Sequence, residues 1–465
     1  MKTSYSIHLI LSIIIVSINS IGANAQNDIK GDWSGILQTP FQKLRLNFNI
    51  QSSPIGFKSV MDSPDQGAMD ILVNHTVFNG DTIRMSISDL RMSYVGVLQG
   101  DSIVNGEFKQ SGMTFPLKLR KGYVKLNRPQ TPVPPFSYKV EEVKFHNKQA
   151  GIELVGTLTF PNNVKQAPAV VLISGSGLQD RDESIFGHKP FAVIADYLTN
   201  RGIAVLRFDD RSVGKSGGDA TNATTVDFAT DVTAAVNYLQ HRKEINKKQI
   251  GLIGHSEGGL IAPMVAAQEK RIAFVILMAA PGVPGDKLLL EQQQLMGRAG
   301  GMSEKQLDAM RYNNEKIFDI LKVTSSIEQA EDSVWGYIEA SDLAHDTNFN
   351  RVAFGKQLDQ LTTPWMMYFL NYDPAETLIK VKCPTLILNG LRDLQVSAKQ
   401  NVPPIELSLK LGGNKAVTTH EYKNVNHLFQ ECRTGSIGEY SIIEQTISPE
   451  VLQDIQKWIA DVVSK

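Results

Sequence analysis

The sequence predicts an α/β protein with a mostly parallel sheet, an inserted helical segment, and a separate antiparallel β domain at its N-terminal side. Three observations lead to this prediction. Short apolar runs without alternation, such as Ile250–Ile253, recur between helical stretches over residues 138–465, which is typical of strands buried on both faces. Residues 43–51 alternate polar and apolar side chains, as a half-buried strand does. Between Pro281 and Pro374 the strand-like runs stop and helical stretches replace them.

Length and charge narrow the class of protein. A chain of 465 residues is long enough for two or three domains, each with its own core. Lys and Arg number 47 against 48 Asp and Glu, so no excess of positive charge favours nucleic acid or an anionic membrane as a partner. The composition, with 42% apolar and 20% charged residues, is that of a globular protein. The oligomeric state has no signature in the sequence.

The N-terminus has the pattern of a secretory signal peptide. Lys2 precedes an apolar run from Ile7 to Ile18, and Ala23-Asn24-Ala25 supplies a small-residue cleavage site. This run is too short for a membrane-spanning helix, which needs about 20 apolar residues. The sequence therefore predicts cleavage after Ala25, a periplasmic or secreted protein, and no stable membrane anchor.

The predicted domains follow in order along the chain. Residues 1–25 are the signal peptide, 26–128 a β-rich domain, 129–137 a Pro-rich linker, and 138–465 the α/β domain, with a helical cap at about 284–374. Turn residues such as those at 79–81 separate the strand-like runs of the β-rich domain. Its role stays open: a structural appendage is the favoured interpretation, and ligand binding is the alternative.

Within residues 138–465 strands and helices alternate. After a hairpin at 138–145 and 152–160, the expected strands are 169–173, 203–208, 250–253, 273–278, 385–388 and 417–422. The expected helices outside the cap are 191–200, 226–240, 258–268, 396–411 and 449–463.

The most informative stretch is Gly254-His-Ser256-Glu-Gly258, which lies between a predicted strand and an Ala-rich helix. This is a G-x-S-x-G motif in the strand–turn–helix context that the motif requires. The glycines leave room for a sharp turn that exposes the serine hydroxyl above a helix N-terminus. We therefore predict Ser256 as a nucleophile.

A serine nucleophile needs a base, and the base needs an orienting acid. Asp393 lies three residues past Gly390, in the turn after the 385–388 strand, and His427 follows the final strand. The chain order Ser, Asp, His is the one found with this motif. No other histidine follows the final strand, and His255 is expected to pack beneath the turn. The predicted triad is Ser256, Asp393 and His427.

Two further groups of site residues are predicted. The oxyanion hole is assigned to the backbone N–H groups of Glu257, the residue after the nucleophile, and Ser176, in the Gly/Ser turn after the 169–173 strand. The apolar stretch at 365–370 is favoured as ordinary helix packing. A hypothesis adds that some of its side chains line an acyl pocket: Trp365, Met366, Tyr368 and Phe369.

Cysteines and charged side chains indicate no metal or cofactor. The chain has only two cysteines, Cys383 and Cys432, predicted to lie too far apart for a disulfide and to be free, buried thiols. Metal-ligating residues do not cluster, so neither a metal nor a cofactor is expected. The charges of Asp180-Arg181-Asp182 are expected to neutralise one another in a solvated loop.

These motifs together resemble those of the α/β-hydrolase superfamily, in its serine aminopeptidase and monoacylglycerol lipase-like branch. Within it the chain is similar to two-domain bacterial carboxylesterases with an N-terminal β domain. Many relatives have His-Gly where this chain has Ser174-Gly175. The motifs that carry the resemblance are Gly175–Asp182, Asp209–Gly217, Gly254–Gly259, Gly390–Asp393 and Asn426–Phe429.

The resemblance implies the α/β-hydrolase fold with a cap, and the predicted triad implies a serine hydrolase of the carboxylesterase type. We expect cleavage of a small-molecule ester through an acyl-serine intermediate. A peptidase or amidase of the aminopeptidase kind, or an acyl thioesterase, would use the same triad. A non-catalytic ligand-binding protein is the alternative from another class, and an intact triad argues against it. The sequence does not indicate the natural substrate or the preferred length of its acyl chain.

Overall fold

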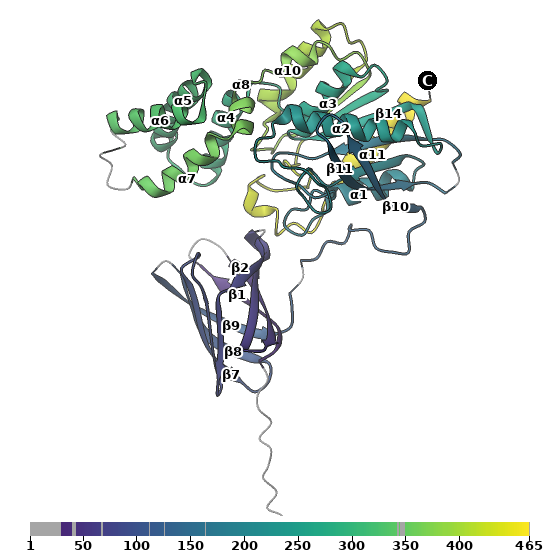
Figure 1. Cartoon of the computed structure of the whole chain (residues 1–465). Coiled ribbons are helices and arrows are strands. Elements are labelled where there is room, and N and C mark those ends of the chain that lie inside the picture. The colour runs from purple at the N-terminus through teal and green to yellow at the C-terminus, as the bar shows by residue number, and fades with distance from the viewer. Residues whose placement is uncertain are drawn as a thin grey trace, which may run out of the picture. The chain divides into compact units, whose positions relative to one another are not determined.

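The computed structural model describes residues 29–464, apart from 40–42, 67, 111, 125, 163, 342–343 and 345–348. The predicted signal peptide, residues 1–25, lies outside the described residues. The chain divides into two compact units between Val124 and Lys125 (Figure 1). In the part of the chain that is described, no helix has the length and apolar character needed to cross a membrane.

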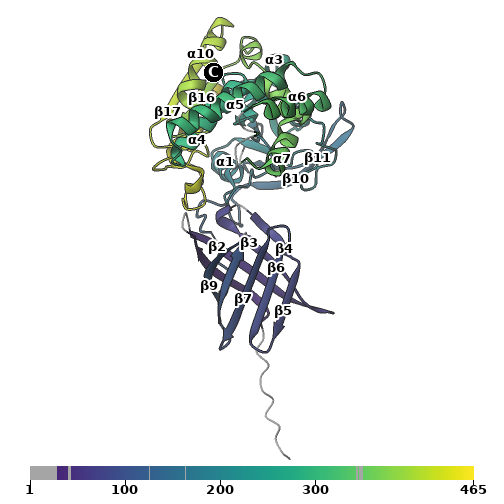
Figure 2. The ribbon, with the colours of Figure 1, turned by 90° about the vertical axis from the view of Figure 1, so that its left-hand side faces the viewer.

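The first unit is a single antiparallel sheet of nine strands in the order β4-β3-β2-β1-β9-β8-β7-β6-β5 (Figure 2). Its two ends come together where the Thr76 hydroxyl of β5 bonds the Ser59 hydroxyl of β3 at 2.9 Å, so the sheet nearly closes. The strands are β1 (Gly31–Gln38), β2 (Lys43–Ser53), β3 (Gly56–Ser63), β4 (Ala68–Val73), β5 (His75–Asn79), β6 (Thr82–Ile87), β7 (Met92–Gln99), β8 (Ile103–Gln110) and β9 (Met113–Lys121).

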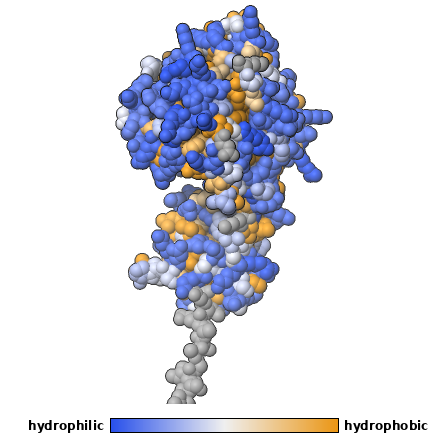
Figure 3. Space-filling model, turned by 90° about the vertical axis from the view of Figure 1, so that its right-hand side faces the viewer, coloured by the Kyte–Doolittle hydropathy of each residue, from blue (hydrophilic) through white to orange (hydrophobic). Residues whose placement is uncertain are grey.

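The interior of this β unit explains the alternation in its sequence. In β2, Leu44, Leu46, Phe48 and Ile50 are buried, and of the polar residues between them Arg45 and Asn49 are partly exposed whereas Asn47 is also buried. Trp33, Phe48 and Tyr94 fill the centre, with the Phe48 and Tyr94 rings stacked at 6.1 Å. Apolar side chains also gather on parts of the unit's outer surface (Figure 3). The exposed ones include Ile36, Ile55, Met69, Leu72, Val77 and Met113.

The second unit is built on an eight-stranded sheet in the order β10-β11-β13-β12-β14-β15-β16-β17. The β10–β11 hairpin and the β11–β13 pair are antiparallel, and every later pair is parallel. The strands are β10 (Lys139–Asn147), β11 (Ile152–Phe160), β12 (Ala167–Ile173), β13 (Ala204–Phe208), β14 (Ile245–His255), β15 (Phe274–Met278), β16 (Thr385–Gly390) and β17 (Val417–Tyr422).

Helices cover both faces of this sheet. In β12, Val171 and Ile173 face a core shared with α2, α3 and α10, whereas Val170 and Leu172 face a core shared with α1 and α11. A strand with apolar side chains on both faces gives the unbroken apolar run seen in the sequence. The helices are α1 (Pro190–Thr199), α2 (Thr225–Gln240), α3 (Gly258–Gln268), α10 (Ala398–Leu411) and α11 (Pro449–Val463).

A group of helices stands between β15 and β16 in the chain and forms a cap with its own core (Figure 1). That core contains Ile317 and Leu321 of α5, Val334 of α6 and Leu370 of α8. The cap also contacts the α/β layers, because Phe369 of α8 packs with Leu260 of α3. The helices are α4 (Gly285–Ala299), α5 (Glu304–Val323), α6 (Ile327–Ala340), α7 (Arg351–Leu361) and α8 (Pro364–Asn371), and α9 (Ala375–Leu378) leads back to the sheet.

The predicted fold class is confirmed: a mostly parallel sheet with helices on both faces and an inserted helical cap, preceded by an antiparallel β unit. One detail differs. The strand that ends at His255 begins at Ile245 rather than Ile250, because Ile245 already pairs with Ala167 of β12, and the register shifts before pairing resumes at Ile250. The two cysteines are free as expected, but each is only half-buried.

Candidate active site

The candidate nucleophile stands at a strained turn between β14 and α3. Ser256 has φ of +52°, a left-handed conformation that is uncommon for a residue with a side chain. Its amide bonds the Met278 carbonyl of β15 at 2.9 Å. Glycine is required on both sides, because a Cβ on Gly254 would overlap the Gly258 carbonyl and one on Gly258 would overlap the Ile173 carbonyl. The turn presents Ser256 to a cavity.

The candidate base and acid meet at the carboxyl ends of the last two strands. His427 Nδ1 and Asp393 Oδ2 are 2.7 Å apart, and the Asp393 side chain is fully buried. The other oxygen of that carboxylate accepts the amides of Gln395 and Val396, each at 2.8 Å. Asp393 is therefore held by its own loop while it fixes the imidazole. His427 and Ser256 line the same cavity.

The turn after β12 lies against the nucleophile. A Cβ built on Gly175 would stand 3.1 Å from the Ser256 Cβ, so only glycine fits there without displacement. The Gly175 amide already donates to Glu183 Oε1 at 2.8 Å. Among the residues that the structure describes, no acceptor is found for the amides of Ser176 and Glu257. Both residues line the cavity, which is where an oxyanion would need two donors.

A buried acid, Asp210, fastens this turn at both ends. The Ser174 hydroxyl donates to Asp210 Oδ1 at 3.0 Å, and the Gln179 amide donates to Asp210 Oδ2 at 2.9 Å. Burial raises the pKa of Asp210 to about 7, and the nearby carboxylates of Glu257 and Glu183 contribute further. Asp210 thus sets the path of the backbone that carries Ser176.

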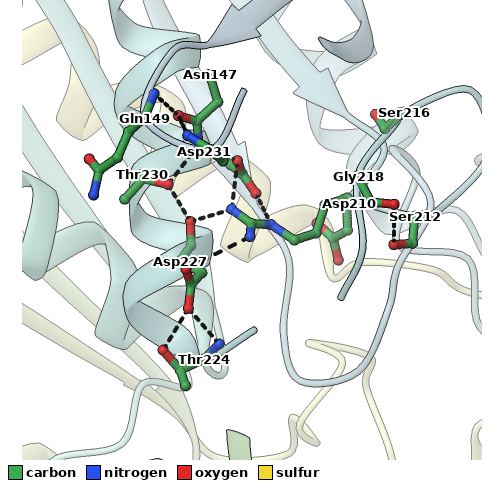
Figure 4. A network of polar contacts seen from close by, with 12 residues as sticks. Asn147, Gln149, Asp210, Ser212, Ser216, Gly218, Thr224, Asp227, Thr230 and Asp231 are labelled. Carbon is green, nitrogen blue, oxygen red and sulfur yellow. Dashed lines mark hydrogen bonds and ion pairs between the residues drawn. The ribbon is translucent and has the colours of Figure 1, made fainter. Parts of the chain in front are cut away.

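The residue after Asp210 ties the same segment to α2 (Figure 4). The Arg211 guanidinium bonds both oxygens of Asp231, at 2.8 and 3.0 Å, and the carbonyl of Asp227 at 2.9 Å. Asn147 of the β10–β11 hairpin donates to the same Asp231 carboxylate at 2.6 Å. This buried network explains why the Asp-Asp-Arg segment accompanies the site without touching the cavity.

The loop charges at 180–182 behave differently from the expectation. Arg181 is mostly buried rather than solvated, and its guanidinium bonds both oxygens of Asp209, at 3.0 and 2.6 Å. Asp182 pairs with Arg207 at 2.8 Å. The expected solvated loop was wrong, because β13 and the segment after it supply partners that are distant in the chain.

The cavity has a volume of about 290 Å³ and lies between the nucleophile turn and the cap. Trp365 and Phe369 of α8 line it, with their rings stacked at 5.3 Å. Met366 and Tyr368 do not, so that part of the pocket prediction is corrected. Residues four apart share one face of a helix, while Met366 packs in the cap core and Tyr368 stacks on Tyr372 elsewhere.

The side chain of Glu257 joins the nucleophile turn to the cap. Its Oε1 accepts the Trp365 indole N–H and the Thr225 hydroxyl, both at 2.7 Å. Burial raises the pKa of Glu257. One buried carboxyl therefore joins the cap wall of the cavity to α2.

Sequence reasoning missed four side chains that shape this site: Glu183, Asp210, the carboxyl of Glu257, and His255 as more than packing. None carries a local signature, because each acts through a partner distant in the chain. Asp210, His255 and Glu257 lie inside two of the motifs that carry the resemblance, and Glu183 directly follows another, but those motifs do not show which partners these side chains meet.

The sheet order, the helices on both faces and the inserted cap give the chain the α/β-hydrolase fold. Its residues 188–334 match the family model described as serine aminopeptidase, S33.

Two curated relatives illustrate the similarity. The chain is 26% identical over 322 residues to Esterase EstD of Thermotoga maritima, a match that covers 69% of each chain. It is 33% identical over 147 residues to the uncharacterized protein PA2218 of Pseudomonas aeruginosa, covering 30% of this chain and 38% of that one.

Two solved structures are also similar to the chain. The structure of PA2218 superposes with a TM-score of 0.45 at 17% identity, covering 73% of this chain and 98% of that one. Est1E from Butyrivibrio proteoclasticus, solved with ferulic acid bound, superposes with a TM-score of 0.42 at 16% identity, and the match covers 70% of this chain and 100% of that one.

Proposed function

We propose that the chain hydrolyses carboxylic esters with Ser256 as the nucleophile and an acyl-serine intermediate. The single observation that carries the proposal is the meeting of three elements around one cavity: the strained Ser256 turn, the buried His427–Asp393 pair at 2.7 Å, and the turn bearing Ser176. At a coarser level the chain is an esterase-type hydrolase, as its similarity to Esterase EstD supports.

In the proposed reaction, His427 accepts the Ser256 proton as the hydroxyl oxygen attacks the ester carbonyl. Asp393 holds the imidazole with its proton on Nδ1, so that Nε2 is free to act as the base. The amides of Ser176 and Glu257 stabilise the negative charge on the tetrahedral oxygen. His427 then protonates the leaving alcohol and, in the second half, activates water to release the acid.

The cavity suggests the substrate class. At about 290 Å³ it is near the lower end of ligand pockets, and Trp365 and Phe369 form an apolar wall. We expect esters of short or compact acyl groups to react faster than long-chain ones.

The test is hydrolysis of p-nitrophenyl esters from acetate to palmitate by the wild type and by Ser256→Ala. We expect activity with an optimum at short chains, and a loss on the order of 10⁴-fold or more in the variant. A folded wild type inactive on every ester would refute the proposal. Activity on aminoacyl anilides instead would favour the amidase alternative, and activity on acyl thioesters alone the thioesterase.

The proposal places this hydrolase outside the cytoplasm, because residues 7–25 have the pattern of a cleaved signal peptide. The expected mature chain starts at Gln26. N-terminal sequencing of the protein secreted or released from the periplasm would check this start, and a full-length chain retained in the cytoplasm would contradict it.

A further inference from the structure

A second histidine–carboxylate pair lies beside the first one. His255, the residue before the nucleophile, and Glu183, from the loop before α1, are 7% and 6% exposed. The His255 ring packs against the His427 ring, with centroids 4.9 Å apart. Neither Glu183 nor His255 has a role in the reaction described above.

The contacts of His255 determine where its protons are. Nε2 is 3.0 Å from the backbone carbonyl oxygen of His427, which can only accept, so Nε2 carries a hydrogen. Nδ1 is 2.9 Å from Glu183 Oε1. That oxygen also accepts the Gly175 amide at 2.8 Å, a bond that favours the ionised carboxylate. A hydrogen on both nitrogens makes His255 an imidazolium paired with a carboxylate.

The charges around His255 agree with this arrangement. Burial works against a charged ring, but the charge of Glu183 and its hydrogen bond outweigh it, and the pKa of His255 is raised. The carboxylate of Asp393 and the bond to the His427 carbonyl act in the same direction. Of the ionisable groups, Glu183 bonds the ring and the imidazole of His427 packs against it, while Asp393 acts through its charge.

The pair joins two loops whose relative position matters for the reaction: the turn after β12 that carries Ser176 and the loop that carries His427. One carboxylate oxygen fixes the amide of Gly175, next to Ser176, and the ring fixes the carbonyl of His427 itself. Glu183 makes these contacts with its backbone in a left-handed conformation, with φ of +51°. A non-glycine residue in that region costs about 1–3 kcal/mol and persists only where its surroundings require it.

We propose that Glu183 and His255 form a buried ion pair that positions the oxyanion turn relative to His427. They are positioning residues, since neither touches the reacting atoms. Their effect on turnover rests on the proposed function. Their charge state does not, and it is measured separately.

The first experiment follows the protonation of His255 by NMR in the full chain labelled with ¹⁵N-histidine, between pH 5 and 9. The His255→Gln spectrum assigns the signals. We expect both ring nitrogens of the wild type to stay protonated through pH 8, and the ring to become neutral below that pH in Glu183→Gln. A neutral His255 ring at pH 7 in the wild type would overturn the proposal, whether or not the chain hydrolyses esters.

The second experiment measures kcat and KM of Glu183→Gln on the best ester. We expect kcat to fall about 10²-fold, the scale of a misplaced catalytic group, with KM changed by less than about threefold. Asp180→Asn is the matched control in the same loop: its Oδ1 accepts the amides of Asp182 and Ser184, which an amide oxygen also does. It should leave kcat unchanged. An unchanged kcat in Glu183→Gln, with Ser256-dependent turnover intact, would overturn the positioning role.

Discussion

Replacing Asp393 by Asn tests how the candidate base is oriented. Asp393 Oδ1 accepts two backbone amides, from Gln395 and Val396, at 2.8 Å each, and Oδ2 faces His427 Nδ1 at 2.7 Å. An Asn side chain must keep its oxygen on the two amides, because an NH₂ there would oppose two donors. The NH₂ then faces Nδ1 and forces the proton of the imidazole onto Nε2, the atom that has to accept the Ser256 proton.

The size of the effect follows from this change of tautomer. In serine hydrolases of this design, a base in the wrong tautomer lowers kcat about 10⁴-fold. At about 1.36 kcal/mol for each factor of ten, this is about 5.5 kcal/mol of transition-state stabilisation. The melting temperature should change little, because the two amide bonds that hold the loop remain.

The assay is kcat and KM for the best p-nitrophenyl ester, with thermal unfolding measured in parallel. Asp393→Asn should show a low kcat with KM nearly unchanged. A folded variant that keeps kcat within tenfold of the wild type would refute the assignment of Asp393 as the orienting acid.

Three further predictions concern the surroundings of the site. Because the pKa of Asp210 is raised to about 7 in the fold, the ionised carboxyl favours the unfolded chain, and the fold loses stability progressively between about pH 4 and pH 7. Asp210→Asn should therefore raise the melting temperature more at pH 8 than at pH 5, and an equal effect at both pH values would contradict this. Trp365→Ala removes the ring that bonds Glu257 and lines the cavity, so the preferred acyl chain should lengthen in the ester series. An unchanged preference would refute the role of Trp365 in acyl selection. Gly258→Ala should lower stability by about 1–3 kcal/mol or more in denaturant unfolding, whereas Gly217→Ala, whose Cβ would meet its nearest atom at 3.5 Å, should not; equal stabilities would contradict the steric argument.

Much of the fold was predictable because its signals are local. The alternation at 43–51 indicates a strand with one buried face, and the unbroken apolar runs indicate strands with two. The loss of the strand pattern after Pro281 indicates the cap. The nucleophile turn is local too, since its glycines and serine are consecutive. Asp393 and His427 were identified by their order relative to the strands, and their catalytic roles remain predictions.

The rest depended on side chains that meet only after folding. Met366 and Tyr368 were assigned to the pocket because composition does not give the rotation of a helix about its axis. Arg181 was expected in water because its partner Asp209 is 28 residues away in the chain. The Glu183–His255 pair joins residues 72 positions apart, and no spacing rule relates such residues.

The most direct test of the central claim is to trap the covalent intermediate. A fluorophosphonate that reacts with activated serines should add one phosphonyl group to the chain, and peptide mass mapping should place it on Ser256. Ser256→Ala should remain unmodified, and Asp393→Asn should react far more slowly. Modification at another residue, or no modification of a wild type that still hydrolyses esters, would contradict Ser256 as the nucleophile.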